Sequence, residues 1–306
     1  MNRLEANISL FFITFFASVQ YVFLIWVPDS VSHFAFLCIT NLIGLIMSLA
    51  FFFGELFRLD MKQVKHSMIL SGELVVFNIF LLIGVSGLGP AMTNAILSTN
   101  FVFIAAIAFL EYKQIPDTGT FIGIFVVLAG LMLMSEARIS DFMNIGVLYL
   151  TASNIAFAFY VVSVGKYSSS SNPAIIAMGQ MFFCFLFSLI LWIAEVIVKG
   201  IKFSLPGNPE FWGSVLYVSF FIRGLYGIIQ VYAQRYISPL NTSLIFSTEI
   251  IMTMAVSPIL SEFLGTPPDV ITWPKIIGGI AIVFGVMMTE PQFFAWLKKV
   301  LHIGNA

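Results

Sequence analysis

Long apolar runs, separated by short polar or turn-forming stretches, dominate the pattern of this chain. A helix needs about 20 mainly apolar residues to cross a bilayer. The runs are too long for strands and show little alternation, so we interpret them as helices. Pro, Gly and Asp residues mark several of the breaks, as in the segment 267–269. We therefore predict ten spanning helices, at roughly 8–27, 33–53, 66–87, 90–110, 118–135, 143–165, 173–198, 211–235, 239–261 and 271–289.

The composition agrees with an integral membrane protein. Hydrophobic residues make up 59% of the 306 residues and charged residues only 9%. A soluble domain has about 25% charged residues, so this chain has too few polar groups to cover a water-exposed surface. The net charge of −1 gives no reason to expect nucleic acid as a partner. The expected fold class is an all-α membrane protein embedded in a lipid bilayer.

Lysine and arginine are distributed unevenly over the predicted loops. With a cytoplasmic N-terminus, nine of these residues lie inside, four lie outside, and Arg223 lies within a span. Cytoplasmic loops are enriched in Lys and Arg, so we predict a multi-pass plasma-membrane protein with both termini in the cytoplasm. The inner residues are Arg3, Arg58, Lys62, Lys65, Lys113, Lys166, Arg235, Lys298 and Lys299; the outer ones are Arg138, Lys199, Lys202 and Lys275.

An internal echo suggests that the chain is a duplication. The segment 90–100 (PAMTNAILSTN) repeats as 239–249 (PLNTSLIFSTE), an offset of 239 − 90 = 149 residues. Five positions are identical, and the last position has Asn100 in one copy and Glu249 in the other. With five spans in each half, the second copy must cross the membrane in the opposite sense. We predict two inverted five-helix repeats, 1–139 and 140–306, forming one membrane domain with the substrate at their interface.

Further matches between the halves carry a family resemblance. The segment 109–112 (FLEY) matches 260–263 (LSEF), and the Gly123–Gly130 spacing recurs as Gly278–Gly285. Together with the link 232–239 (YAQRYISP), these motifs resemble the EamA-like members of the drug/metabolite transporter superfamily. The resemblance covers nearly the whole chain. It implies a ten-helix transporter without ATPase machinery, commonly an exporter of amino acids or related small polar metabolites.

Enzyme and cofactor motifs were also sought in the sequence. No Walker-type phosphate loop, His-Glu-x-x-His pair or Cys-x-x-Cys pair occurs in it. We therefore expect neither an enzyme nor a cofactor nor a metal site. Transport would then draw on an ion or solute gradient, with protons or a counter-solute as candidate partners beside the small-molecule substrate. The sequence leaves the oligomeric state open.

Three ionisable residues lie well inside predicted spans: Glu73, Arg223 and Glu249. A charge at the bilayer centre costs roughly 2.5–3.5 kcal/mol on insertion scales, so such residues are functional candidates. One interpretation is binding, with a substrate carboxylate on Arg223 and an amine on Glu249 or Glu73. A second is coupling, in which a desolvated carboxyl carries a proton. The third is an Arg–Glu pair that is only structural.

Uncharged polar residues complete the candidate site. Asn100 is the repeat mate of Glu249, and Asn78 and Gln180 are amides within spans, where hydrogen bonds between helices are the alternative explanation. Tyr160 and Tyr226 need partners for their hydroxyls in a dry core. An organic-cation or drug exporter is the main alternative function, and a non-transporting receptor or scaffold is a third. The position of Arg223, in a cavity or paired with a glutamate, distinguishes the first two.

Overall fold

The structure is a computed structural model of the whole chain. It describes residues 1–306 apart from 25, 29, 86–95, 98, 114–117, 136–143, 201–204, 265–269, 289–290 and 301–306. Part of the predicted fourth span, 90–110, and the predicted boundary between the repeats at 139–140 therefore lie outside the described residues.

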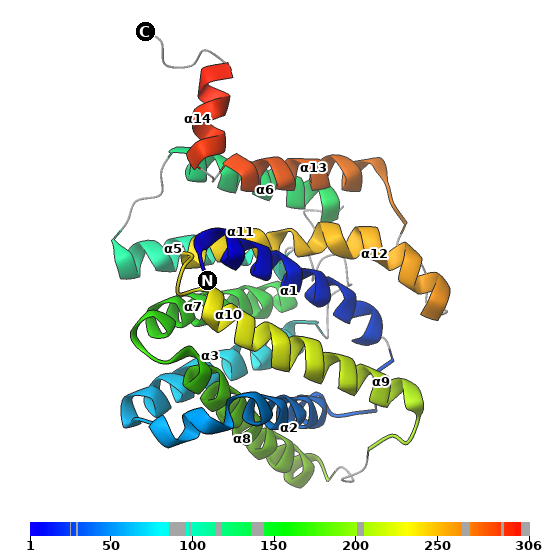
Figure 1. The fold of residues 1–306 in the computed structure, drawn as a ribbon. Helices are drawn as coiled ribbons and strands as arrows, with labels where there is room; N and C mark the ends of the chain where they lie inside the picture. Colours follow the sequence, from blue (N-terminus) through cyan, green and yellow to red (C-terminus); the bar gives the residue numbers. More distant parts are fainter. Residues whose placement is uncertain are drawn as a thin grey trace.

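Every regular element among the described residues is a helix, which confirms the all-α prediction (Figure 1). The helices stack side by side, with α6 and α13 on one outer side and α2, α3 and α8 on the opposite side. The elements are α1 (Arg3–Leu24), α2 (His33–Phe52), the 3₁₀ helix η1 (Phe53–Arg58), α3 (Met61–Val85), α5 (Asn100–Tyr112), α6 (Thr118–Ser135), α7 (Ile145–Ser170), α8 (Pro173–Lys199), α9 (Pro209–Tyr217), the π-helix η3 (Val218–Tyr226), α10 (Gly227–Ala233), α11 (Pro239–Ser247), α12 (Glu249–Leu264), α13 (Trp273–Met288) and α14 (Pro291–Val300).

Five helical segments of the described chain are long and apolar enough to cross a membrane. A sixth is added if the bent pair formed by α13 and α14 is one span. Two further apolar helices, α5 and most of α6, are shorter. The membrane-spanning character is confirmed, while the count of ten spans stays a prediction. The five segments are 33–58, 61–84, 145–170, 173–199 and 209–233.

Side-chain caps explain where several helices begin. The side-chain oxygens of Ser32, Asn144, Asn172 and Ser238 each accept a hydrogen bond from a backbone N–H of the first helical turn. These N–H groups have no partner within the helix, so a capping side chain stabilises the start. The last two caps are followed directly by a proline, whose fixed φ angle suits the first helical position.

The helices pack in pairs that join the two halves of the chain. Two pairs contain one helix from each half in corresponding positions: α2 with α8, and α6 with α13. Helix α5, in the predicted fourth span, packs on α11, in the predicted ninth. Other contacts come in reciprocal pairs, which means that each becomes the other when every helix is replaced by its counterpart in the other half. Helix α3 packs on α7 and on α8, and correspondingly α1 packs on the rod α9–η3–α10 and α2 packs on η3. Likewise α5 packs on α7, and α12 on α1.

The two copies of the sequence echo have the same turn directly before α5 and α12, and we call these two turns the helix breaks. Thr99 precedes α5 and Thr248 precedes α12, with φ/ψ of −80°/1° and −72°/−12°. In the first copy the Thr99 N–H and hydroxyl both donate to the Ile96 carbonyl, at 3.0 and 2.7 Å. In the second copy the Thr248 N–H and hydroxyl donate to the Ile245 carbonyl at the same two distances, 3.0 and 2.7 Å. The predicted span 239–261 is therefore two helices, α11 and α12.

Candidate functional site

Arg223 lies in the middle of an irregular stretch of a spanning segment. The segment 209–233 begins and ends as α-helix, but its central nine residues, Val218–Tyr226, form the π-helix η3. π-Helical turns are rare and often occur at functional sites. The arginine is therefore held on a backbone that departs from the regular helix, at the centre of the segment.

Close packing of α2 against η3 fixes the base of the Arg223 side chain. A Cβ atom added at Gly44 of α2 would lie 2.7 Å from the Arg223 Cβ, closer than real Cβ contacts allow. One turn away, a Cβ atom at Gly224 would lie 2.9 Å from the Met47 Cε. Small residues at such contacts let helix backbones approach each other. Gly44 thus allows α2 to lie directly against the arginine.

The Arg223 side chain reaches a small internal cavity, which we call the arginine cavity. Its volume is about 10 Å³, room for roughly one water molecule. The walls come from α2, α3, α8 and η3. The lining residues are Phe34, Leu37, Asn41, Leu74, Val75, Asn78, Cys184, Ser188, Leu191 and Arg223. The structure therefore brings Arg223 and Asn78 of the predicted set together in one cavity.

Two polar groups of the arginine cavity lack hydrogen-bond partners among the described residues. The Arg223 Nε and the Asn41 Oδ1 are both buried and unpaired. The ion pairs found within the described part of the chain do not include Arg223. Asn78 differs, because its Nδ2 donates to the Leu74 carbonyl of its own helix at 2.6 Å. Buried polar groups are nearly always satisfied, so an unpaired donor and an unpaired acceptor in one cavity require a bound water, ion or ligand.

A chain of three buried polar side chains, which we call the tyrosine chain, lies beside this cavity. The Gln180 Nε2 donates to the Tyr160 hydroxyl at 2.9 Å, and this hydroxyl donates to the Gln230 Oε1 at 3.3 Å. Cys184 of the cavity lies one helical turn after Gln180. The tyrosine chain therefore links α7, α8 and α10 next to the arginine.

Glu73 faces α7 and not the arginine cavity. Its Oε1 accepts a hydrogen bond from the Ser163 hydroxyl at 2.8 Å. Its Oε2 is buried and has no hydrogen-bond partner among the described residues. The residues that line the cavity on α3 are Leu74, Val75 and Asn78, which begin directly after Glu73. Glu73 is thus a neighbour of the site that points to a different helix.

Six residues of the predicted set are not among the lining residues of the arginine cavity. Glu73, Gln180 and Tyr160 are described above; the other three are Glu249, Asn100 and Tyr226. Glu249 and Asn100 begin α12 and α5, directly after the two helix breaks, and both are half-buried. The Tyr226 ring packs on the Phe246 ring, with their centroids 5.4 Å apart. These residues lie along the helix breaks and the contacts of α1, so any role in transport would be exerted away from the cavity.

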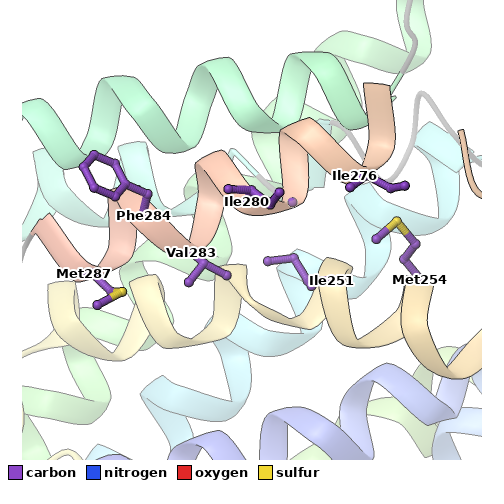
Figure 2. A pocket seen from close by; sticks show the side chains of 8 residues that line it. Ile251, Met254, Ile276, Ile280, Val283, Phe284 and Met287 are labelled. Carbon is purple, nitrogen blue, oxygen red and sulfur yellow. The ribbon is translucent and has the colours of Figure 1, made fainter. Parts of the chain in front are cut away.

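A larger groove lies between α12 and α13 (Figure 2). Its volume is about 410 Å³, and its lining is apolar throughout. A site for a small polar solute needs a few placed polar groups, which this groove lacks. The groove therefore does not compete with the arginine cavity as the binding site. The lining residues are Ile251, Met254, Ile276, Gly279, Ile280, Val283, Phe284 and Met287.

Sequence reasoning did not select Asn41, Ser188 or Gln230 for the site. Each is a polar residue inside an apolar run, which is also true of amides that only join helices. A signal that could have pointed to Asn41 is its position in the predicted second span, which is comparable to that of Gln180 in the predicted seventh. Within the described chain, no group of His, Cys, Asp and Glu residues has the arrangement of a metal site.

Comparisons with known proteins agree with this architecture. Residues 144–290 match the EamA-like transporter family. A chain from a crystal structure of a protein shares the fold, with a TM-score of 0.72 and 14% sequence identity over 96% of this chain and 98% of that one. No curated protein matches the chain by sequence. Residues 144–290 are thus similar to an EamA-like transporter domain, which is consistent with a membrane transporter of the drug/metabolite type.

Proposed function

We propose that the protein is a secondary transporter that exports amino acids or related small polar metabolites across the plasma membrane by alternating access. Its two halves, 1–139 and 140–306, would be inverted repeats with both termini in the cytoplasm. The substrate would bind at the arginine cavity through a carboxylate. The observation that carries the proposal is the buried, unpaired Nε of the half-buried Arg223, in a cavity formed by helices of both halves.

The reciprocal helix pairs support the repeat part of this proposal. Exchanging the two halves maps each of the contacts α3–α7, α3–α8 and α5–α7 onto another observed contact. Inverted repeats of this kind give a transporter two equivalent conformations, one open to each side.

The ends of the α2–α8 pair add a second match between the halves. At one end Glu195 accepts a hydrogen bond from Ser32, the cap of α2. At the other end Glu55 accepts one from Asn172, the cap of α8, at 2.8 Å. The offsets are 172 − 32 = 140 and 195 − 55 = 140 residues. Each carboxylate also pairs with a basic residue three or four positions later in the chain. We call these two arrangements the end latches.

The organic-cation exporter remains the alternative function. A cation site needs a carboxylate facing the substrate and gains from aromatic walls. Among the described residues that line the arginine cavity, the only charged one is a cation, Arg223, and the only aromatic one is Phe34. These features favour a carboxylate over an organic cation as the transported group.

Reconstitution into proteoliposomes tests the proposal. Counterflow of radiolabelled amino acids, monocarboxylates and amines is measured for the wild type and for Arg223→Gln. Arg235→Gln, at an exposed position, is the matched control. We expect carboxylate-containing solutes to move in the wild type and the control, and to lose at least about 100-fold in rate in Arg223→Gln, because a charge-assisted bidentate contact is lost. A wild type that moves amines but no carboxylate would favour the alternative function.

A further inference from the structure

We infer that the arginine cavity selects neutral amino acids with apolar side chains, and that Asn41 recognises their amino group. This inference rests on the proposed function and adds the substrate class. In this arrangement the α-carboxylate lies on Arg223, the α-ammonium donates to the Asn41 Oδ1, and the side chain packs on the apolar part of the wall. No acidic residue is needed for the amino group.

The hydrogen bonds around Ser188 determine the orientation of the Asn41 amide. The Ser188 hydroxyl donates to the backbone carbonyls of Cys184 and Phe185, at 2.6 and 3.0 Å. Its single proton is therefore used, and the hydroxyl can only accept from Asn41. The Asn41 Nδ2 donates to it at 3.4 Å. This leaves the Oδ1 as the acceptor that lacks a partner.

An acceptor and a donor of this kind match the two ends of an α-amino acid. A guanidinium has five N–H donors and no acceptor, whereas an amide oxygen accepts only. A carboxylate satisfies the donors of the guanidinium, and an ammonium group satisfies the amide oxygen. A ligand with only one of these groups would leave either Arg223 or Asn41 with an unsatisfied buried polar atom, which costs free energy. The pair therefore discriminates amino acids from simple acids and simple amines.

The rest of the wall limits the side chain of the substrate. Beside Arg223, the described lining has no charged group, and half of its residues are large and apolar. A second charge on the substrate would face these groups without a counter-charge, which is strongly unfavourable. Leucine-like or aromatic side chains fit this surface better than those of glutamate or lysine. The apolar residues are Phe34, Leu37, Leu74, Val75 and Leu191.

The packing also indicates where the cavity must widen to admit such a substrate. Its present volume of about 10 Å³ is too small for an amino acid. Helix α8 packs on both α2 and α3, while α2 packs on η3 and α3 packs on α7. Asn41 and Arg223 thus belong to one wall, α2–η3, and the wall that α3 forms is backed by α7. Separation of these walls over α8 enlarges the cavity without parting Asn41 from Arg223.

Uptake of four matched solutes into proteoliposomes tests the inference. The solutes are leucine, 4-methylpentanoate (leucine without the amino group), 3-methylbutylamine (without the carboxylate) and glutamate. We expect the wild type to prefer leucine over each of the others by about 10- to 100-fold in kcat/KM, the range for a hydrogen bond to a charged group. Asn41→Ala is expected to lose the preference for leucine over 4-methylpentanoate, because leucine loses the acceptor for its ammonium group while the acid no longer leaves the Asn41 Oδ1 unsatisfied.

If Asn41→Ala is unstable, two further variants, Asn41→Asp and Ser169→Ala, still test the inference. The aspartate retains an acceptor, so it is expected to keep the preference for leucine. Ser169 is exposed at the end of α7, and its variant controls for handling. Equal transport of leucine and 4-methylpentanoate by the wild type, or a preference unchanged in Asn41→Ala, would overturn the inference while leaving a carboxylate transporter in place. Failure of all four solutes to move would count against the proposed function itself.

Discussion

The two helix breaks, at Thr99 and at Thr248, have the same backbone and different surroundings. In both, the threonine N–H and hydroxyl donate to the carbonyl three residues earlier, at matching distances. At the first break the Asn154 Nδ2 also donates to the Ile96 carbonyl, at 2.5 Å, and to the Thr99 hydroxyl, at 3.2 Å, and Asn100 follows. At the second break Glu249 follows. The halves thus repeat the backbone, whereas the side chains that determine charge differ.

The same contrast holds for the third and eighth spans. Helix α3 contributes Glu73, which faces Ser163, while η3 contributes Arg223, which faces the cavity. The two halves share their helix caps, helix breaks and end latches because both halves must pack in equivalent ways. A substrate with distinct ends requires unlike groups, so the chemistry is expected to be asymmetric. Variants that equalise or remove these differences test the comparison.

The largest effect is expected from Glu249→Gln, which removes the charge that distinguishes the second break. If Glu249 carries the coupling proton, uptake driven by a pH gradient is abolished. Exchange of substrate at equal pH is expected to stay within about threefold, because Glu249 does not line the arginine cavity. The measurement is uptake into proteoliposomes with and without a pH gradient. Asn100→Asp, the mirror change at the first break, is the control. Survival of pH-driven uptake would exclude Glu249 as the coupling residue.

A second large effect is expected from Gly44→Ala. The added methyl group would lie 2.7 Å from the Arg223 Cβ, so α2 or η3 must shift. Overpacking of this kind costs about 1–3 kcal/mol, and a displaced arginine is expected to lower kcat/KM by about 10-fold or more. Gly72→Ala on α3 is the matched control, because nothing lies within 4 Å of its added Cβ. Equal kinetics for the two variants would show that the contact of α2 with η3 does not position Arg223.

Asn154→Ala is expected to have a smaller effect, limited to the first break. It removes the hydrogen bonds to the Ile96 carbonyl and to the Thr99 hydroxyl, each worth about 0.5–1.5 kcal/mol, while the Ile96 carbonyl keeps its Thr99 donors. Thermal unfolding in detergent measures this cost, and it should exceed that of Asn144→Ala, a helix cap worth about 1 kcal/mol. Similar losses for the two variants would mean that the Asn154 contact contributes no more than an ordinary cap.

The smallest effects concern the end latches. Glu55→Gln and Glu195→Gln remove one carboxylate each, at opposite ends of the α2–α8 pair. Glutamine keeps an acceptor for the capping residue, and partly exposed ion pairs contribute about 0–1 kcal/mol. We expect both variants to lose less than about 1 kcal/mol of stability and to resemble each other. A much larger loss at one end would show that the latches differ in function as well as in sequence.

Much of the fold could be predicted because it follows from local pattern. Apolar runs located the spans, and residues such as Asn172 and Pro173 marked helix starts. The echo identified positions 100 and 249 as equivalent, and the structure places both directly after a helix break. Local pattern did not indicate the breaks themselves or the π-helix around Arg223, because no proline or other sequence signal marks them.

The candidate site was predicted only in part. Depth within a span selected Arg223, Asn78 and Gln180 as candidates, but depth does not determine which way a side chain faces. Glu249 was expected beside Arg223 because both lie in mid-span, yet it does not line the arginine cavity. Asn41 reaches that cavity because Gly44 brings α2 against η3. Such long-range contacts depend on how helices pack, and hydropathy alone does not determine them.

The most direct test uses Cys184, which lines the arginine cavity, as a reporter. In a Cys38→Ala background, its rate of modification by a small methanethiosulfonate is measured in proteoliposomes with and without leucine. If a carboxylate binds Arg223 in this cavity, leucine slows the modification several-fold, and the protection disappears in Arg223→Gln. Modification at the same rate with and without leucine, in a protein that still transports leucine, would contradict a substrate site at the arginine cavity.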